Sequence, residues 1–188
     1  LRDLSVSYER GGDTRVASGD YAAALESYGK ALTIREEFAA RDPGNTLRQR
    51  DLAVTFERIG DTNNLLGDRE SALLAQQAAA AIRERLASLD PTNMLWQRDL
   101  SVSYERLGDL YLAQNDFVAA LEQQERARTL REAIVSLEPQ NLPRQRDLGI
   151  TLEKIASVKL AMGDNAGAET LWTEVTNLRR SLVTADPV

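Results

Sequence analysis

One segment occurs four times in this chain at a constant interval. The stretch RDLSVSYERGGD at residues 2–13 returns as RDLSVSYERLGD at 98–109, and related versions occupy 50–61 and 146–157. The aspartate near the start of each copy lies at position 3, 51, 99 or 147, so each interval (51−3, 99−51, 147−99) is 48 residues. A fixed period of this length is typical of repeat proteins, whose units pack on their neighbours in series. We therefore predict a single array of four units, at approximately residues 1–45, 46–93, 94–141 and 142–188.

Two fixed breaks divide each unit into two helices. The first break is a proline preceded by an acidic residue, at Pro43, Pro91, Pro139 and Pro187. The second is a pair of residues, Gly-Asp or Asn-Asp, that begins at Gly19, Gly67, Asn115 and Gly163. Gly or Asn favours the left-handed conformation that closes a helix, and the following Asp can cap the next one. Asn residues two positions after the first three prolines, at Asn45, Asn93 and Asn141, are also preferred N-caps.

Both predicted helices carry apolar residues at helical spacing. In the second helix of the first unit they recur at steps of three or four, at Ala24, Tyr28, Ala31, Ile34 and Phe38. An isolated pair of such helices cannot cover its own apolar faces, whereas stacked pairs can. We therefore predict an all-α fold, a right-handed α-solenoid of four helix-turn-helix repeats, with helices of roughly 18–20 residues.

The pattern within each unit resembles the tetratricopeptide repeat. That family has an aromatic residue, Leu-Gly and Tyr on the first helix, Gly-Asp-Tyr at the turn, and two Ala on the second helix. The third unit matches this pattern at Tyr104, Leu107, Gly108, Tyr111, Asn115, Asp116, Phe117, Ala120 and Ala127. The resemblance covers essentially the whole chain, and it implies a concave groove lined by the first helices.

Several positions depart from the family pattern. The family unit has about 34 residues, so the 48-residue unit implies helices about two turns longer on the side of the proline. In the fourth unit Ala156 replaces the glycine, and Trp172 is expected in the core or at an interface. The pair Gly11–Gly12 suggests local loosening or a kink, and Arg179–Arg180 suggests an isolated basic pair on a solvated face.

The two ends of the sequence suggest a fragment of a longer chain. Leu1 lies in mid-repeat without an initiator Met, and no polar capping helix follows the last pair. We expect further chain, or a partner, to cover the outer face of that pair.

Composition argues against several classes of function. The chain has no Cys and no His, so we expect no catalytic residue, no metal and no cofactor. Its net charge of −6 argues against nucleic-acid and membrane partners. No signal peptide or membrane-spanning run is visible, and we expect a cytoplasmic location.

The predicted groove floor carries rows of Glu, Arg and Asp with a row of valines among them. These rows have two interpretations: charge ladders that tie neighbouring repeats together, or a floor that binds a ligand. The predicted partner-binding residues are Glu9, Arg10, Asp13, Val54, Glu57, Arg58, Asp61, Asn64, Leu65, Val102, Glu105, Arg106, Asp109, Leu112, Glu153 and Lys154. Floor positions that vary between copies, such as Val16 and Leu160, are the better candidates for selectivity.

The predicted function is a non-catalytic scaffold that binds a peptide or helix of a partner protein, or of the same polypeptide, in the groove. The alternative is a structural or oligomerisation arm whose uncovered repeat ends associate with each other. The carboxylate clamp known in the family is not supported, because Glu and Asp accompany each Arg and only Asn63–Asn64 resembles it. Long, nearly identical repeats also look like those of bacterial multidomain signalling proteins.

Overall fold

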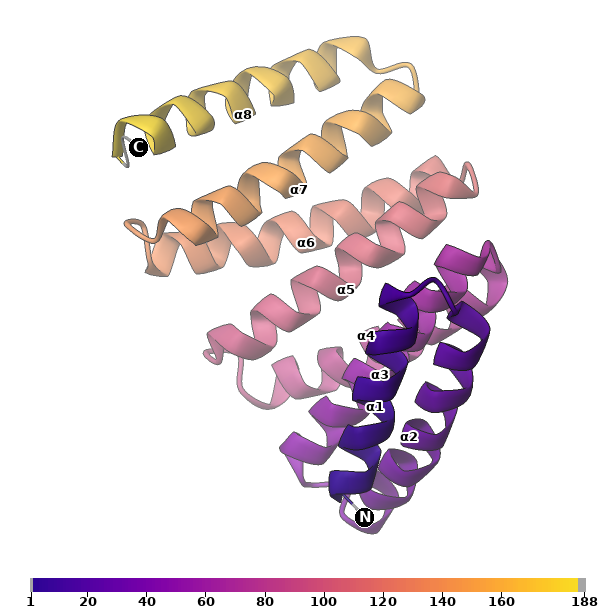
Figure 1. Cartoon of the computed structure of the whole chain (residues 1–188). Coiled ribbons are helices and arrows are strands. Elements are labelled where there is room, and N and C mark those ends of the chain that lie inside the picture. The colour runs from indigo at the N-terminus through magenta and orange to yellow at the C-terminus, as the bar shows by residue number, and fades with distance from the viewer. Residues whose placement is uncertain (1, 186–188) are drawn as a thin grey trace. The chain divides into compact units, whose positions relative to one another are not determined.

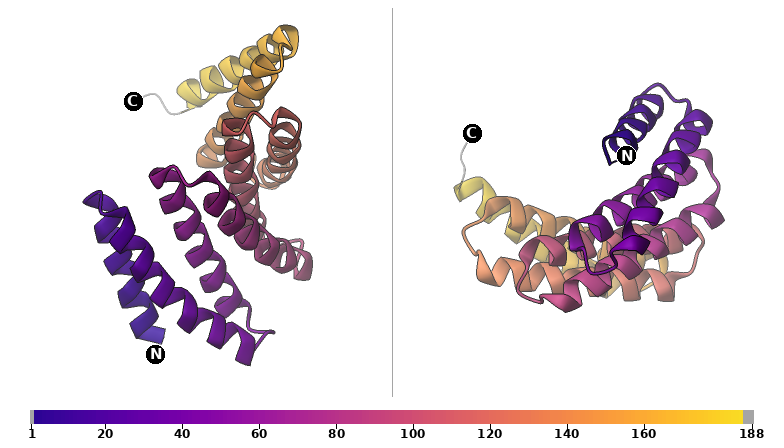
Figure 2. Two further views of the ribbon diagram at one scale, coloured as in Figure 1. Left: turned by 90° about the vertical axis from the view of Figure 1, so that its right-hand side faces the viewer. Right: turned by 90° about the horizontal axis from the view of Figure 1, so that it is seen from below.

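A computed structural model describes residues 2–185, and all the regular elements in this range are α-helices (Figure 1). They form four pairs: α1 (Arg2–Ala17) with α2 (Tyr21–Arg41), α3 (Thr46–Leu66) with α4 (Arg69–Leu89), α5 (Met94–Ala113) with α6 (Phe117–Leu137), and α7 (Leu142–Ala161) with α8 (Asn165–Ala185). The two helices of each pair lie side by side and run antiparallel (Figures 1 and 2). The predicted all-α fold of helix-turn-helix repeats is confirmed.

The chain divides into two compact units of two helix pairs each, Leu1–Pro91 and Thr92–Val188. In the first unit α2 packs against both α1 and α3, and in the second unit α6 packs against both α5 and α7. A second helix therefore joins its own pair to the next pair along the chain. The core of the fourth pair consists of Leu152, Ile155, Ala156, Ala168, Leu171 and Val175.

The helix boundaries fall where the sequence predicts them. The side chains of Asn45, Asn93 and Asn141 each accept a hydrogen bond from the backbone amide three residues later, which caps the first helices of the last three pairs. Gly19, Gly67 and Gly163 have φ near +80°, and Asn115 has φ +61°. These four residues end the first helices in the left-handed conformation, as predicted.

The aspartates that follow these turns make the stability of the fold depend on pH in the acid range. A hydrogen bond from Lys159 and one from the Gly167 amide hold the pKa of Asp164 below its ordinary value, and the Ser71 amide lowers the pKa of Asp68. A carboxylate with a lowered folded pKa contributes stability above its unfolded pKa of about 3.9 and loses it as pH falls through the folded value. We expect the unfolding temperature, followed by circular dichroism, to fall between about pH 5 and about pH 2. An equally steep fall in the Asp68→Asn, Asp164→Asn double variant, which keeps both caps, would contradict this assignment.

A glycine in each of the first three pairs makes room for a side chain from the second helix. A Cβ at Gly12 would lie 2.3 Å from Cε1 of Tyr28, and one at Gly108 would lie 2.5 Å from Nε2 of Gln124. Gly60 lies against Gln76 in the same way. Since α1 continues through Gly12, this glycine serves close helix packing, and the predicted local loosening is not its role.

The side chain that covers each glycine also bonds to the aspartate beside it. The Tyr28 hydroxyl donates to Asp13 Oδ1 at 2.7 Å, and Gln124 Nε2 donates to Asp109 Oδ1 at 3.1 Å. Burial and the bond to Asp13 raise the pKa of Tyr28 far above its ordinary value, so its hydroxyl stays a donor. Tyr and Gln can therefore occupy one position, because both are long and both end in a donor.

The fourth pair departs from this arrangement: Trp172 does not lie in the core, and its predicted place at an interface stays a prediction. Ala156 is fully buried at the glycine position, whereas Trp172 is 41% exposed on α8. The Cβ of Ala156 fills the space that glycine leaves in the other pairs. A side chain at position 172 therefore cannot enter between the helices.

Candidate functional site

The glutamates of the predicted groove floor are engaged by arginines of the second helices. Glu9 and Arg35 are 9% and 6% exposed, and both Glu9 oxygens accept hydrogen bonds from the Arg35 guanidinium, at 2.8 and 2.7 Å. Arg35 also donates to the Thr55 hydroxyl at 2.6 Å and to the Asp51 carbonyl at 2.7 Å. A buried charge needs such partners, since its desolvation cost is several kcal/mol. One guanidinium therefore ties α2 to both α1 and α3.

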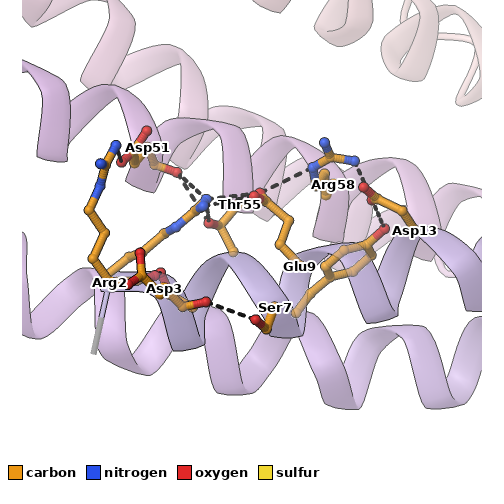
Figure 3. Close-up of polar contacts among 11 residues, drawn as sticks. Arg2, Asp3, Ser7, Glu9, Asp13, Asp51, Thr55 and Arg58 are labelled. Atoms are coloured by element: carbon orange, nitrogen blue, oxygen red, sulfur yellow. Dashed lines mark hydrogen bonds and ion pairs between the residues drawn. The ribbon is translucent and has the colours of Figure 1, made fainter.

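A second arginine crosses from the next repeat to the same carboxylate (Figure 3). Arg58 on α3 donates through Nε to Glu9 Oε1 at 3.1 Å and also bonds to Asp13. Partial burial lowers the pKa of Arg58, but the carboxylates of Asp13 and Glu9 more than offset it, so the net shift is upward. The prediction that Glu of one repeat reaches Arg of the next is confirmed for Glu9 and Arg58.

The second unit repeats these contacts with the equivalent side chains. Arg131 on α6 donates to Glu105 at 2.9 Å and lies 3.7 Å from Asp147 on α7. The Thr151 hydroxyl bonds to Glu105, and Lys154 pairs with Asp109. We call the set of contacts between one pair and the first helix of the next the inter-repeat joint. In the first unit it comprises Arg2, Glu9, Asp13, Arg35, Asp51, Thr55 and Arg58.

The glutamate–arginine pair within each repeat was missed by the sequence analysis. Glu57 pairs with Arg83, and Glu153 pairs with Arg179. Arg179 is therefore not isolated, although its side chain is 63% exposed and does lie on a solvated face as predicted. A signal was present, because the four arginines keep the repeat interval at positions 35, 83, 131 and 179.

Other predicted floor residues are more accessible. Asn64 and Leu65 near the end of α3, Arg10 on α1 and Asp109 on α5 are exposed. Leu65 is 53% exposed, and Leu160 on α7 is 57% exposed. The half-buried members of the set are Asp13, Val54, Glu57, Arg58, Asp61, Val102, Arg106, Leu112, Glu153 and Lys154. A partner-binding role for any of these residues stays a prediction.

Comparison with known families agrees with this geometry. Residues 7–38 and residues 100–140 each match a model of the tetratricopeptide repeat. The chain carries tetratricopeptide repeats in these two segments. Its repeat is lengthened to 48 residues, and helices α2 to α8 each span 20 or 21 residues.

Solved structures share the fold of this tetratricopeptide-repeat array at low sequence identity. BtubC (BKLC) from P. vanneervenii has a TM-score of 0.78 at 21% identity, over 97% of this chain and 66% of that chain. The chain thus spans slightly less than two thirds of BtubC. A Podospora anserina structure described as a kinesin light chain candidate with nearly identical TPR-like repeats has a TM-score of 0.52 at 13% identity, covering 96% of this chain and 97% of that one. No curated protein matches the chain significantly in sequence.

The matched tetratricopeptide repeats support a general role as a protein-interaction scaffold. Within residues 2–185, none of the helices is long and apolar enough to cross a membrane.

Proposed function

We propose that the chain is a non-catalytic, cytoplasmic scaffold that binds a peptide or helix of another protein on the first-helix surface. The main support is the exposure of Leu65 and Leu160, two large apolar side chains among charged neighbours. Each lies near the turn end of a first helix, one in each compact unit. Exposed apolar side chains at these places could serve as anchor points for the apolar residues of a bound segment.

The proposed partner segment carries apolar anchors flanked by charged residues. Leu65 would receive an apolar anchor in the first unit, and Asp61 on the same helix supplies negative charge. In the second unit Leu160 and Leu112 would have the same role. We further propose that such a partner belongs to a larger multidomain assembly of the signalling type.

Selection from a randomised peptide library displayed on phage tests this proposal. We expect the purified chain to enrich peptides with apolar residues beside charged ones. Leu65→Asp with Leu160→Asp should weaken binding of the enriched peptides at least about tenfold, because desolvated apolar anchors dominate such interfaces. The matched control is Leu74→Asp, since Leu74 is 62% exposed on the second helix α4.

Equal loss of binding in the Leu74→Asp control, or selection without any enrichment, would contradict the proposed surface. The double charge reversal Glu57→Arg with Arg58→Glu would be a poor test of the peptide-binding surface. Glu57 pairs with Arg83, and Arg58 pairs with Glu9 and Asp13, so the reversal breaks contacts within the fold.

The alternative role is an arm that associates with itself through its repeat ends. One specific observation favours it: a groove of about 470 Å³ lies open between α7 and α8.

A further inference from the structure

The inter-repeat joint is lined at equivalent positions in both units, with the same residue type at five of the six. In the first unit a cavity of about 110 Å³ is bounded by Arg2, Ser5, Arg35, Phe38, Arg48 and Asp51. In the second unit a cavity of about 10 Å³ is bounded by the residues 96 positions later, Arg98, Ser101, Arg131, Ile134, Arg144 and Asp147. The match of all six positions shows that one joint geometry is used twice.

The incoming first helix contributes a fixed set of groups to this joint. In the first unit they are Asp51, Thr55 and Arg58, and in the second unit Asp147, Thr151 and Lys154. Thr55 and Thr151 are both fully buried. The joint therefore accepts a helix that carries Asp, then a hydroxyl four residues later, then a basic residue three further on.

The open groove between α7 and α8 is the same joint without an incoming helix. Its lining includes Arg146, Gly149, Arg179 and Leu182, which are equivalent to Arg98, Ser101, Arg131 and Ile134 of the closed joint. We call this lining, together with Ile150 and Val183, the tail groove. Val183 is 68% exposed and Ile150 is 45% exposed. The tail groove, at about 470 Å³, is much larger than either closed cavity.

Helix α1 carries the complementary groups on a face that no described helix covers. Asp3, Ser7 and Arg10 are equivalent to Asp51, Thr55 and Arg58, and all three are exposed. Figure 3 shows Asp3 and Ser7 on the side of α1 that points away from Asp51 and Thr55. Leu4 is 43% exposed, whereas its equivalent Leu52 is 8% exposed. We call Asp3, Leu4, Ser7 and Arg10 the head face.

We propose that the head face of one copy of this chain docks into the tail groove of a second copy and rebuilds the inter-repeat joint. By equivalence with the closed joints, Arg146 and Arg179 face Asp3 and Ser7 of the second copy, and Arg10 faces Glu153. This inference specifies the alternative role above and is independent of the peptide-binding surface. Because the two surfaces differ, the contact is heterologous and adds copies in one direction.

The intermolecular joint lacks one contact of the internal joints. Ser157 stands where Asp109 pairs with Lys154, so the incoming Arg10 meets one carboxylate instead of two. The contact is therefore weaker than the joints within the chain, and it depends on concentration.

Sedimentation equilibrium of the purified chain, from about 1 µM to about 1 mM, tests the proposal without any added ligand. We expect the average mass to rise with concentration above the 20.8 kDa of the monomer. Val183→Glu blocks the tail groove and Ser7→Arg places a cation against Arg179, so each should raise the dissociation constant at least about tenfold. Ser7 is exposed with its hydroxyl bonded to the Asp3 carbonyl of its own helix, Val183 is 68% exposed, and circular dichroism checks that helicity is unchanged.

Matched control variants lie at positions that face solvent in every repeat. Thr33→Arg controls for Ser7→Arg, since both hydroxyls bond to the carbonyl four residues earlier and Thr33 is exposed on α2. Asn177→Glu controls for Val183→Glu, since Asn177 is exposed on the same helix. Both controls should associate like the original chain.

A mixture of the two blocked variants tests the head-to-tail direction. The Val183→Glu variant keeps its head face, and the Ser7→Arg variant keeps its tail groove. The mixture should therefore form a dimer of twice 20.8 kDa and nothing larger. A chain that stays monomeric over the whole concentration range overturns the proposal. The tail groove would then bind a helix of different sequence. Association that neither variant weakens, or a mixture that does not dimerise, overturns it as well.

Discussion

Arg35→Ala is expected to lower the free energy of unfolding by about 3–5 kcal/mol, because it leaves a buried carboxylate without its main partner. Arg35 is 6% exposed and donates to both oxygens of Glu9. The change also removes the donor that reaches Thr55 on the next repeat. Urea unfolding followed by circular dichroism measures the loss, and hydrogen exchange should locate it in α1 to α3.

Two comparisons separate this effect from a general loss of charge. Arg41 pairs with Glu37 on the surface, where its side chain is 63% exposed, so Arg41→Ala should cost less than about 1 kcal/mol. Replacing both Glu9 and Arg35 by Met should cost much less than Arg35→Ala, since apolar residues often substitute for a buried ion pair. If Arg35→Ala costs no more than Arg41→Ala, the buried pair does not hold the repeats together.

Gly12→Ala is expected to destabilise the chain by about 1–3 kcal/mol, the usual cost of overpacking a core. The new Cβ would lie 2.3 Å from the Tyr28 ring, which is 2% exposed and held by its bond to Asp13. The direction of this change in the free energy of unfolding is informative, because alanine is otherwise favoured over glycine inside a helix by about 1 kcal/mol. The same urea unfolding measurement applies.

Gly29→Ala is the matched control for this substitution. Nothing lies within 4 Å of a Cβ at Gly29, which is also inside a helix, so this change should stabilise by about 0.5–1 kcal/mol. Gly12→Ala should likewise become stabilising when Tyr28 is already replaced by Ala, which a double-mutant cycle reports as a coupling energy. A Gly12→Ala chain as stable as Gly29→Ala would refute the close contact.

The helices and their ends could be predicted because their signals are local and repeated. Asn45 and Gly19 act through hydrogen bonds and dihedral angles within a few residues, so the sequence alone indicates their roles. Four copies of each signal also remove the ambiguity of a single occurrence. The role of Gly12 was missed, because close packing depends on a residue 16 positions away, Tyr28, in another helix.

The candidate site was harder to predict because its charges are shared among three helices. A helical wheel of the first helices places Glu9 on an open floor, yet Arg35 from the second helix covers it. Arg35 and its equivalents stand among other charged residues, where only their constant interval distinguishes them from solvated ones. Trp172 was misplaced for a related reason: its surroundings depend on Ala156 in the neighbouring helix.

The matching linings of the two joints have a consequence for how such a chain changes over generations. Because equivalent charged side chains meet at junctions 96 residues apart, a unit that carries the same charges can stand at either of these two junctions. A single change such as Arg35 to another residue instead disrupts contacts on both sides at once. A change in the number of 48-residue units should therefore disturb the junction contacts less than a substitution within a junction.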